Sequence, residues 1–109
     1  MIHKYRAWDR ETKSMNGMAE IYRNRKQEIE LHPRDENIIL MQSTGLRDKN
    51  GKEIFEGDVL ETKDGLLDGV VEYRTDLGMW TNSLFRYNNF ERLCNVADST
   101  YIIGNIYEN

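Results

Sequence analysis

The sequence predicts a small, mostly β protein: an SH3-like or partly open β-barrel with an N-terminal β lobe. Short stretches of alternating apolar and polar residues recur along the 109-residue chain, which is typical of strands with one wet face. Eleven aromatic residues and one proline argue for a packed core, because disordered chains are poor in the former and rich in the latter. Six glycines fall singly between these stretches, where turns are expected. They are Gly45, Gly51, Gly57, Gly65, Gly69 and Gly78.

The first third is predicted to hold three short strands separated by polar turns. The strands are Ile2–Trp8, Glu20–Arg23 and Gln27–Leu31. We expect turns at Asp9–Thr12, which is almost wholly polar, and at Asn16-Gly17, a dipeptide that favours tight turns. In the first strand Lys4, Arg6 and Trp8 share one face, because successive side chains of a strand point to opposite sides.

A linker is predicted at His32–Asn37, which is hydrophilic and contains Pro33, a residue that cannot donate to a sheet. The charge balance also changes there. Residues 1–34 hold eight Lys/Arg and five Asp/Glu, whereas residues 35–109 hold seven and fourteen. We therefore expect an N-terminal β-hairpin lobe over residues 1–33 and an SH3-like β-barrel domain over 34–109, with one compact unit as the alternative.

The second part of the chain is predicted to hold five strands: Ile38–Gln42, Val59–Thr62, Gly69–Thr75, Gly78–Thr81 and Tyr101–Tyr107. Turns are expected at Asp48–Gly51, where Asn-Gly would supply two positive-φ positions, at Glu56–Asp58, and at the dipeptides Asp64-Gly65 and Asp68-Gly69. Between Phe90 and Ala97, apolar spacing of three and four residues predicts one or two helical turns.

Three apolar residues are expected in the core: Trp8, Phe55 and Ile106. Gly104 shares a strand face with Ile102 and Ile106, which predicts that another backbone segment or a bulky ring packs closely against it. Cys94 is the single cysteine and is expected to be a small buried hydrophobe, so no intramolecular disulfide can form. This cysteine usage predicts a reducing, cytoplasmic environment, and no apolar run approaches the length of a membrane span.

No catalytic or metal constellation emerges. His3, His32 and Cys94 are too dispersed for a zinc site, and no motif marks a serine as activated. Asp48, Glu53, Glu56 and Asp58 fall within eleven residues. Paired carboxylates could act as acid and base, but aspartates beside turn glycines more often bond the local backbone. We therefore predict no enzyme activity, no cofactor and no metal.

Two candidate partner-binding features remain. The run Tyr22, Arg23, Arg25 and Lys26 places a ring beside three cations, which can stack a base and contact phosphate, although such a run is more often a solvated hairpin tip. Trp80 is the other candidate, because SH3-like domains recognise partners through exposed aromatic residues. This second hypothesis depends on a ring that faces solvent.

Three sequence blocks carry a family resemblance. They are Tyr5–Asp9 continuing to Met15, Met41–Leu46 with Asp48–Asp58, and Ile103–Asn109. In this order they closely resemble the YopX family of phage and prophage proteins. The resemblance implies a β-rich protein encoded by a phage or prophage and acting in a bacterial cytoplasm. It implies no reaction, cofactor or catalytic residue.

The leading functional hypothesis is a non-enzymatic binding or assembly module that engages a host or phage macromolecule. A protein partner is favoured over nucleic acid, because the acidic residues 35–109 would repel a phosphate backbone. The alternative is a nucleic-acid-binding accessory protein that uses the N-terminal basic segment, and it gains support if Arg6 and Arg10 join that segment on one face. Self-association is also open, since exposed strand edges invite pairing. A hydrolase built on Asp48, Glu56 or Asp58 is the least favoured reading.

Overall fold

The computed structural model describes residues 3–21 and 38–108. Nine strands and one short helical segment follow one another through these residues. They are β1 (His3–Asp9), β2 (Ser14–Ile21), β3 (Ile38–Arg47), β4 (Glu53–Phe55), β5 (Asp58–Glu61), β6 (Gly69–Arg74), β7 (Met79–Leu84), β8 (Phe90–Arg92), α1 (Leu93–Val96), the 3-10 turn Ala97–Ser99, and β9 (Tyr101–Asn105). The prediction of a mostly β fold is confirmed.

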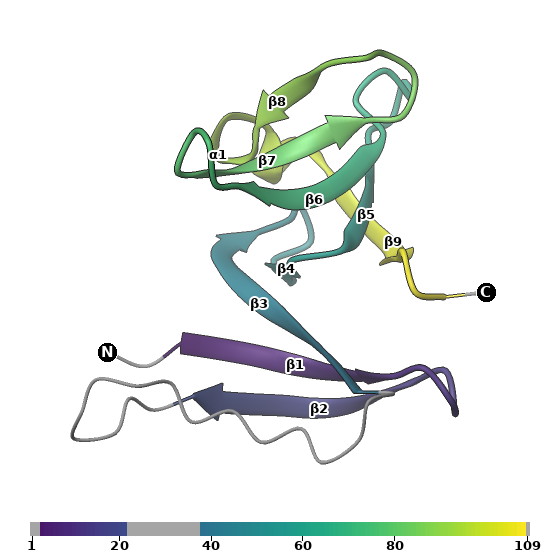
Figure 1. Ribbon diagram of the computed structural model, residues 1–109. Coiled ribbons are helices and arrows are strands. Elements are labelled where there is room, and N and C mark those ends of the chain that lie inside the picture. The colour runs from purple at the N-terminus through teal and green to yellow at the C-terminus, as the bar shows by residue number, and fades with distance from the viewer. Residues whose placement is uncertain (1–2, 22–37, 109) are drawn as a thin grey trace.

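The strands form two antiparallel sheets. One has four strands in the order β2-β1-β3-β4, and the other has five in the order β8-β7-β6-β5-β9. Figure 1 shows β1 and β2 as a flat pair below, with β3 rising from them toward the five-stranded sheet, which curls into a half-barrel. No helix in the described residues has the length and apolar character needed to cross a membrane.

Strand β3 connects the two parts of the molecule. Its first half pairs with β1, from Ile38 opposite Asp9 to Gln42 opposite Tyr5, and its second half pairs with β4. One continuous strand therefore pairs with β1 at its start and with β4 at its end, and it links the β1–β2 pair to the rest of the molecule. The division into lobes at residues 33 and 34 stays a prediction, because that boundary lies outside the described residues.

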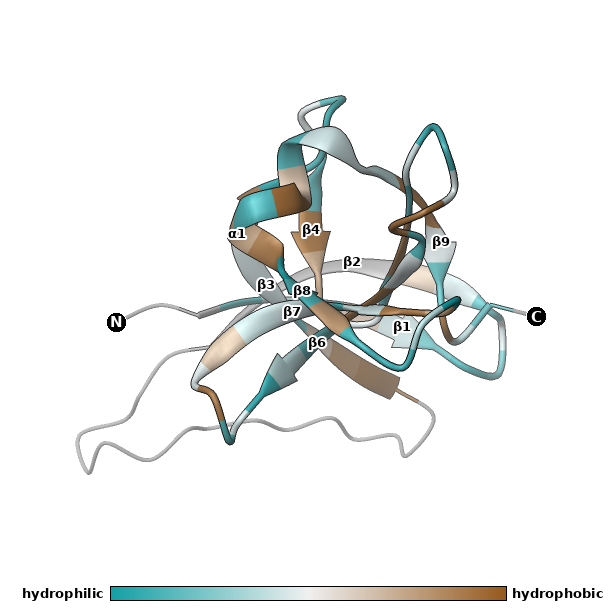
Figure 2. Ribbon diagram, turned by 90° about the horizontal axis from the view of Figure 1, so that it is seen from above, coloured by the Kyte–Doolittle hydropathy of each residue, from teal (hydrophilic) through white to brown (hydrophobic). Residues whose placement is uncertain are grey.

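Two apolar clusters fill the interior. Inside the half-barrel, Ile54, Leu60, Val71, Leu93 and Ala97 are buried together. Between the half-barrel and β1, the buried residues are Trp8, Met41 and Phe55. In Figure 2 the brown, apolar segments include β4 and part of α1, which both supply residues to the first cluster. The expected burial of Trp8 and Phe55 is confirmed.

Ile106 was expected in the core, and that prediction is wrong, since its side chain is 51% exposed. Strand β9 ends at Asn105, whose side-chain oxygen accepts a hydrogen bond from the Tyr107 N–H at 2.9 Å. This turn breaks the alternation of faces on which the prediction depended. The expectation for Cys94 is also wrong: it is exposed, and its neighbours Leu93 and Val96 are the residues of α1 that face the core.

The predicted turn at Asn16-Gly17 is wrong as well, because both residues lie within β2. Pairing with β1 is regular on both sides of them, with Met15 opposite Trp8 and Met18 opposite Arg6, and shifts register at the two residues themselves. The chain reverses earlier, at residues 10–13, where the carboxylate of Asp9 accepts hydrogen bonds from two backbone N–H groups of the turn. The predicted polar turn after the first strand is thus confirmed.

Two glycine predictions need correction. Gly69 is no turn residue: it begins β6, and a Cβ there would lie 2.4 Å from the Ser83 carbonyl oxygen, so the site requires glycine for space. Gly104 does have a close neighbour, but it is the Glu108 carboxylate, 2.6 Å from an ideal Cβ, and neither a ring nor backbone. In the Asp48–Gly51 turn only Gly51 has a positive φ, of +80°, so the two-residue positive-φ turn expected for Asn-Gly is also corrected.

Other local predictions agree in part: the strand expected from Glu20 begins earlier, at Ser14, and β4 and β8 were not predicted. The strand predicted at Gly69–Thr75 is β6, with Val71 buried and Glu72 exposed on the opposite face. The helical turns predicted between Phe90 and Ala97 correspond to α1 and the 3-10 turn, although Phe90 itself belongs to β8. The predicted strand Gln27–Leu31 and linker His32–Asn37 lie outside the described residues.

Candidate functional site

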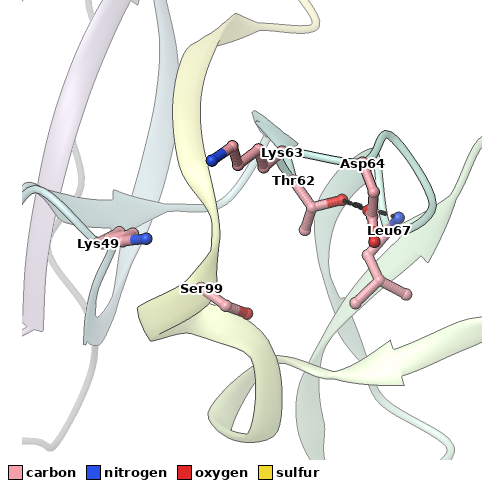
Figure 3. Close-up of a pocket in the computed structure, with 6 residues that line it drawn as sticks. All are labelled: Lys49, Thr62, Lys63, Asp64, Leu67 and Ser99. Carbon is pink, nitrogen blue, oxygen red and sulfur yellow. Dashed lines mark hydrogen bonds between the residues drawn. The ribbon is translucent and has the colours of Figure 1, made fainter.

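A pocket of about 510 Å³ opens on the surface of the half-barrel. Three segments that are distant in sequence line it: the β3–β4 turn, the β5–β6 loop and the end of the 3-10 turn (Figure 3). The lining residues are Lys49, Thr62, Lys63, Asp64, Leu67 and Ser99. We call this feature the lysine pocket.

Hydrogen bonds centred on Thr62 fix the β5–β6 loop. Its backbone N–H donates to the Asp68 carboxylate at 2.9 Å, and its hydroxyl donates to the Asp64 carboxylate at 2.9 Å. The same hydroxyl oxygen accepts a hydrogen bond from the Leu67 N–H at 3.1 Å, and the Thr62 carbonyl accepts one from Gly65. A seven-residue loop with this many internal bonds presents its side chains from a defined backbone.

The buried side chain of Asn82 ties this loop to the sheet. Its amide nitrogen, on β7, donates to the Leu67 carbonyl oxygen at 2.7 Å. Asn82 is fully buried, and the hydrogen bond spans 15 residues of sequence. The wall of the lysine pocket that Leu67 forms is therefore held by the central strands of the half-barrel.

The two lysines give the pocket its charge. The Lys49 N–H donates to the Thr100 carbonyl at 2.9 Å, and its ammonium lies 5.6 Å from the centre of the Tyr101 ring. In Figure 3 the Lys49 and Lys63 side chains extend toward each other from opposite sides of the β9 segment, with Ser99 below. Neither ammonium forms an ion pair within the part of the chain that the structure describes.

The other polar groups of the pocket are already engaged. The Leu66 N–H, followed by the Thr62 hydroxyl, holds the pKa of Asp64 below its usual range, so this carboxylate is ionised at neutral pH. The Ser99 hydroxyl donates to the Val96 carbonyl at 2.9 Å. The arrangement suits binding of an anionic group.

Apolar side chains are exposed at the same end of the half-barrel. Phe85 is 61%, Tyr87 49% and Leu66 44% exposed. Their two loops adjoin, because the Phe85 N–H donates to the Asp68 carbonyl at 3.0 Å and Gly69 pairs with Leu84. We call Leu66, Phe85 and Tyr87 the loop patch. Exposed apolar residues on adjoining loops are candidates for an interaction surface.

A second, smaller hollow adjoins the loop patch. It has a volume of about 340 Å³, and Tyr87 and two asparagines, Asn88 and Asn89, contribute to its lining. Its floor is stiffened by Arg74, whose guanidinium stacks 4.8 Å from the Phe90 ring centre and donates twice to the Asp76 carboxylate. The loop patch therefore borders a polar hollow with amide groups that can bond a peptide backbone.

Of the partner-binding residues predicted from the sequence, the structure describes only Trp80. Tyr22, Arg23, Arg25 and Lys26 lie outside the described residues. Trp80 is half-buried: it packs against the core cluster of the half-barrel and meets the Tyr73 ring edge-on at 5.1 Å. The ring is thus only partly accessible to solvent, and its role in partner binding stays a prediction.

Two of the carboxylates singled out in the sequence, Asp48 and Asp58, are engaged by hydrogen bonds from the backbone. Asp48 is buried and accepts hydrogen bonds from the backbone of Asn50, Lys52 and Ile102. Asp58 accepts one from the Phe55 N–H and pairs with Arg6. Their engagement with local backbone agrees with the turn-stabilising reading. The described residues hold no group of three or more potential metal ligands.

The sequence reasoning missed the lysine pocket and the loop patch. One pattern could have indicated the patch: Phe85 and Tyr87 flank polar residues just before Asn88-Asn89, and aromatic residues in a turn-forming stretch are poorly placed for burial. Lys49, Lys63 and Ser99 are separated by up to 50 residues, and no local pattern relates them.

Comparisons with known proteins relate the chain to a protein family and to a solved structure. The family model described as YopX protein matches residues 4–109. Among solved structures, the chain is similar to the crystal structure of protein EF1440 from Enterococcus faecalis, with 30% sequence identity and a TM-score of 0.60. The match covers 98% of this chain and 94% of that chain. A comparison with curated proteins finds no match.

Proposed function

The chain belongs to the YopX family, and we propose that this member is a non-enzymatic binding module that engages a protein of a bacterial host or of a phage. The observation that carries this proposal is the loop patch, in which Leu66, Phe85 and Tyr87 are each exposed by 44% or more on adjoining loops. Aromatic residues on rigid supports are the usual anchors of protein interfaces, since they bury a large area at a small entropic cost.

The surroundings of the patch support a protein partner. The Thr62-centred bonds and Asn82 hold the β5–β6 loop, so little order has to be imposed on binding. Amide groups in the adjoining hollow can pair with the peptide groups of a partner, which would otherwise lose their hydrogen bonds to water. Protein interfaces commonly combine such an apolar centre with a polar rim.

The nucleic-acid alternative loses one of its expected contacts. Arg6 was to join the basic segment on one face, but its guanidinium pairs with the buried Asp58 carboxylate and stacks 4.6 Å from the Phe55 ring centre. Its side chain is 15% exposed. A guanidinium held in this way is not available to phosphate, and this supports the protein partner.

The proposed site of action is a bacterial cytoplasm. The thiol of Cys94 is exposed, and free exposed thiols persist in reducing compartments. Self-association through the loop patch is the competing use of the same surface.

The test is an affinity capture, with and without nuclease treatment, from lysate of a bacterium that carries the gene. Three forms are compared: the wild-type chain, a Phe85→Ser/Tyr87→Ser variant, and a Leu77→Ser control. Leu77 is 45% exposed in the β6–β7 turn, at the opposite end of that hairpin from the loop patch. We expect one defined protein to be retained by the wild type and the control and lost from the double variant.

Two results would contradict the proposal. Equal capture by all three forms would show that the loop patch is not the contact surface. Loss of all captured material on nuclease treatment would favour the nucleic-acid alternative. Light scattering of the purified chain completes the test. A wild-type dimer that becomes a monomer in the double variant would assign the patch to self-association.

A further inference from the structure

We propose that the lysine pocket receives a single carboxylate side chain of the protein segment that docks on the loop patch. This inference rests on the proposed function and adds the chemistry of the partner: an acidic residue close to an apolar one. Lys49 and Lys63 both line the pocket, their side chains extend toward each other in the view of Figure 3, and each ammonium lacks an ion-pair partner among the described residues.

The lack of partners is informative because carboxylates are plentiful. Residues 35–109 carry fourteen Asp/Glu and seven Lys/Arg. Asp64, the acidic residue that lines the pocket, has one oxygen bonded to both the Thr62 hydroxyl and the Leu66 N–H. The bonds of Asp64 stabilise the loop, and the two lysines remain for a ligand.

The two lysine backbones are fixed before any ligand arrives. Lys49 follows the buried Asp48 and is bonded to Thr100, and Lys63 follows Thr62, the centre of the loop network. The Tyr101 ring beneath the Lys49 ammonium replaces part of its water shell. A carboxylate between two such ammonium groups gains charge-assisted bonds without a large ordering cost.

The rim of the pocket favours one carboxylate over a chain of phosphates. Asp64 lines it, and Asp98 is exposed next to Ser99. These charges repel any anion, but a carboxylate side chain brings one negative charge, whereas a nucleic acid brings one for each phosphate and needs a continuous basic track. Leu67, the apolar wall, suits the methylene groups of an acidic side chain.

The pocket and the loop patch are continuous along the chain. Leu66 is exposed in the patch, and the next residue, Leu67, lines the pocket. One extended segment can therefore place an apolar side chain on Leu66 and an acidic side chain between the lysines. This geometry defines the probe for the experiment.

The experiment is an NMR titration of the ¹⁵N-labelled full chain with the capped dipeptide acetyl-Glu-Leu-amide. Three further probes are the Gln-Leu counterpart, inorganic phosphate and a short single-stranded DNA. The protein forms are the wild type, Lys49→Ala/Lys63→Ala and a Lys52→Ala control. Lys52 is exposed on the same turn as Lys49 but does not line the pocket.

We expect the Glu peptide to shift the amide signals of residues 49, 63, 67 and 99. Its affinity should fall by about tenfold or more for the Gln peptide or for the double variant, and by less than about twofold for Lys52→Ala. Equal affinities of the two peptides, or of the double variant and the control, would overturn the proposal. Tighter lysine-dependent binding of phosphate or DNA would overturn it in favour of a phosphate ligand.

The same variants separate this inference from the proposed function. In the affinity capture, Lys49→Ala/Lys63→Ala should weaken retention of the partner, and Lys52→Ala should not. Retention by the lysine variant together with loss from Phe85→Ser/Tyr87→Ser would refute the carboxylate pocket and leave the binding module standing. Loss from neither variant would refute both.

Discussion

The guanidinium of Arg6, on β1, donates a hydrogen bond to the carboxylate of Asp58, at the start of β5. The pair joins the four-stranded sheet to the half-barrel across 52 residues of sequence. The Asp58 side chain is 1% and the Arg6 side chain 15% exposed. The other Asp58 oxygen accepts a hydrogen bond from the Phe55 N–H at 2.8 Å, so the pair also fixes the β4–β5 turn.

Replacing Arg6 should destabilise the fold strongly. Arg6→Met keeps most of the packing on Phe55 but leaves the Asp58 carboxylate buried without its partner, and we expect a loss of about 3 kcal/mol or more in the free energy of unfolding by urea. Burial already raises the pKa of Asp58, so the loss should be smaller at acidic pH, where the carboxyl is neutral. The control is Lys4→Met, since Lys4 is 53% exposed and lies 3.8 Å from Glu53. A similar loss for both variants would contradict this account.

Gly69→Ala should be among the most damaging glycine substitutions. The new Cβ would lie 2.4 Å from the Ser83 carbonyl oxygen and 2.5 Å from Asn82 Oδ1, so β6 and β7 would have to separate. We expect a loss of about 3 kcal/mol in stability, measured by thermal or urea unfolding. Gly78→Ala tests φ alone, because Gly78 has a φ of +64° and no atom within 4 Å of an added Cβ. Gly69→Ala should be the less stable of the two; the reverse order would refute the steric argument.

Asp48→Ala should loosen the β3–β4 turn and its attachment to β9. The carboxylate accepts three backbone hydrogen bonds, from Asn50 and Lys52 on one oxygen and from Ile102 on the other. Their loss should lower stability by about 3 kcal/mol and speed hydrogen exchange at the Lys52 and Ile102 amides. Asp98→Ala, at an exposed aspartate, serves as the control. Unchanged exchange at Ile102 would show that Asp48 does not tie the turn to β9.

Glu56→Gln should flatten the dependence of stability on pH. Burial raises the pKa of Glu56, and a hydrogen bond to the Gln42 backbone only partly opposes this. The folded protein therefore binds this proton more tightly than the unfolded chain does. The resulting stabilisation is fully present below the unfolded pKa, near 4.5, and is lost as the pH rises through the folded pKa.

The glutamine variant has no proton to lose and should be at least as stable as the wild type at neutral pH. Urea unfolding between pH 4 and 7 measures how the stability of the wild type and of Glu56→Gln changes with pH. The control is Glu61→Gln, at an exposed position. The assignment would be contradicted if the stability of the wild type, of Glu56→Gln and of Glu61→Gln changed by the same amount through this pH range.

The sequence by itself determined the features that depend on neighbouring residues. Turns were predicted at Gly51 and Gly57, and both glycines have the positive φ that such turns favour. In β6 the alternation of residues placed Val71 inside the half-barrel, because a strand turns every second side chain to the same face. The spacing of apolar residues after Phe90 likewise predicted the helical turns.

Tertiary structure alone decided the features that depend on distant segments. Strand β2 passes through Asn16-Gly17 with a register shift, in which these two residues oppose the single residue Ala7 of β1, and regular pairing resumes on both sides. The close approach of the Ser83 carbonyl oxygen explains why residue 69 must be glycine. The Arg6–Asp58 pair joins residues 52 positions apart. The lysine pocket brings together residues 49, 63 and 99. Their proximity follows from how the chain folds back on itself, which local propensities and periodicity do not encode.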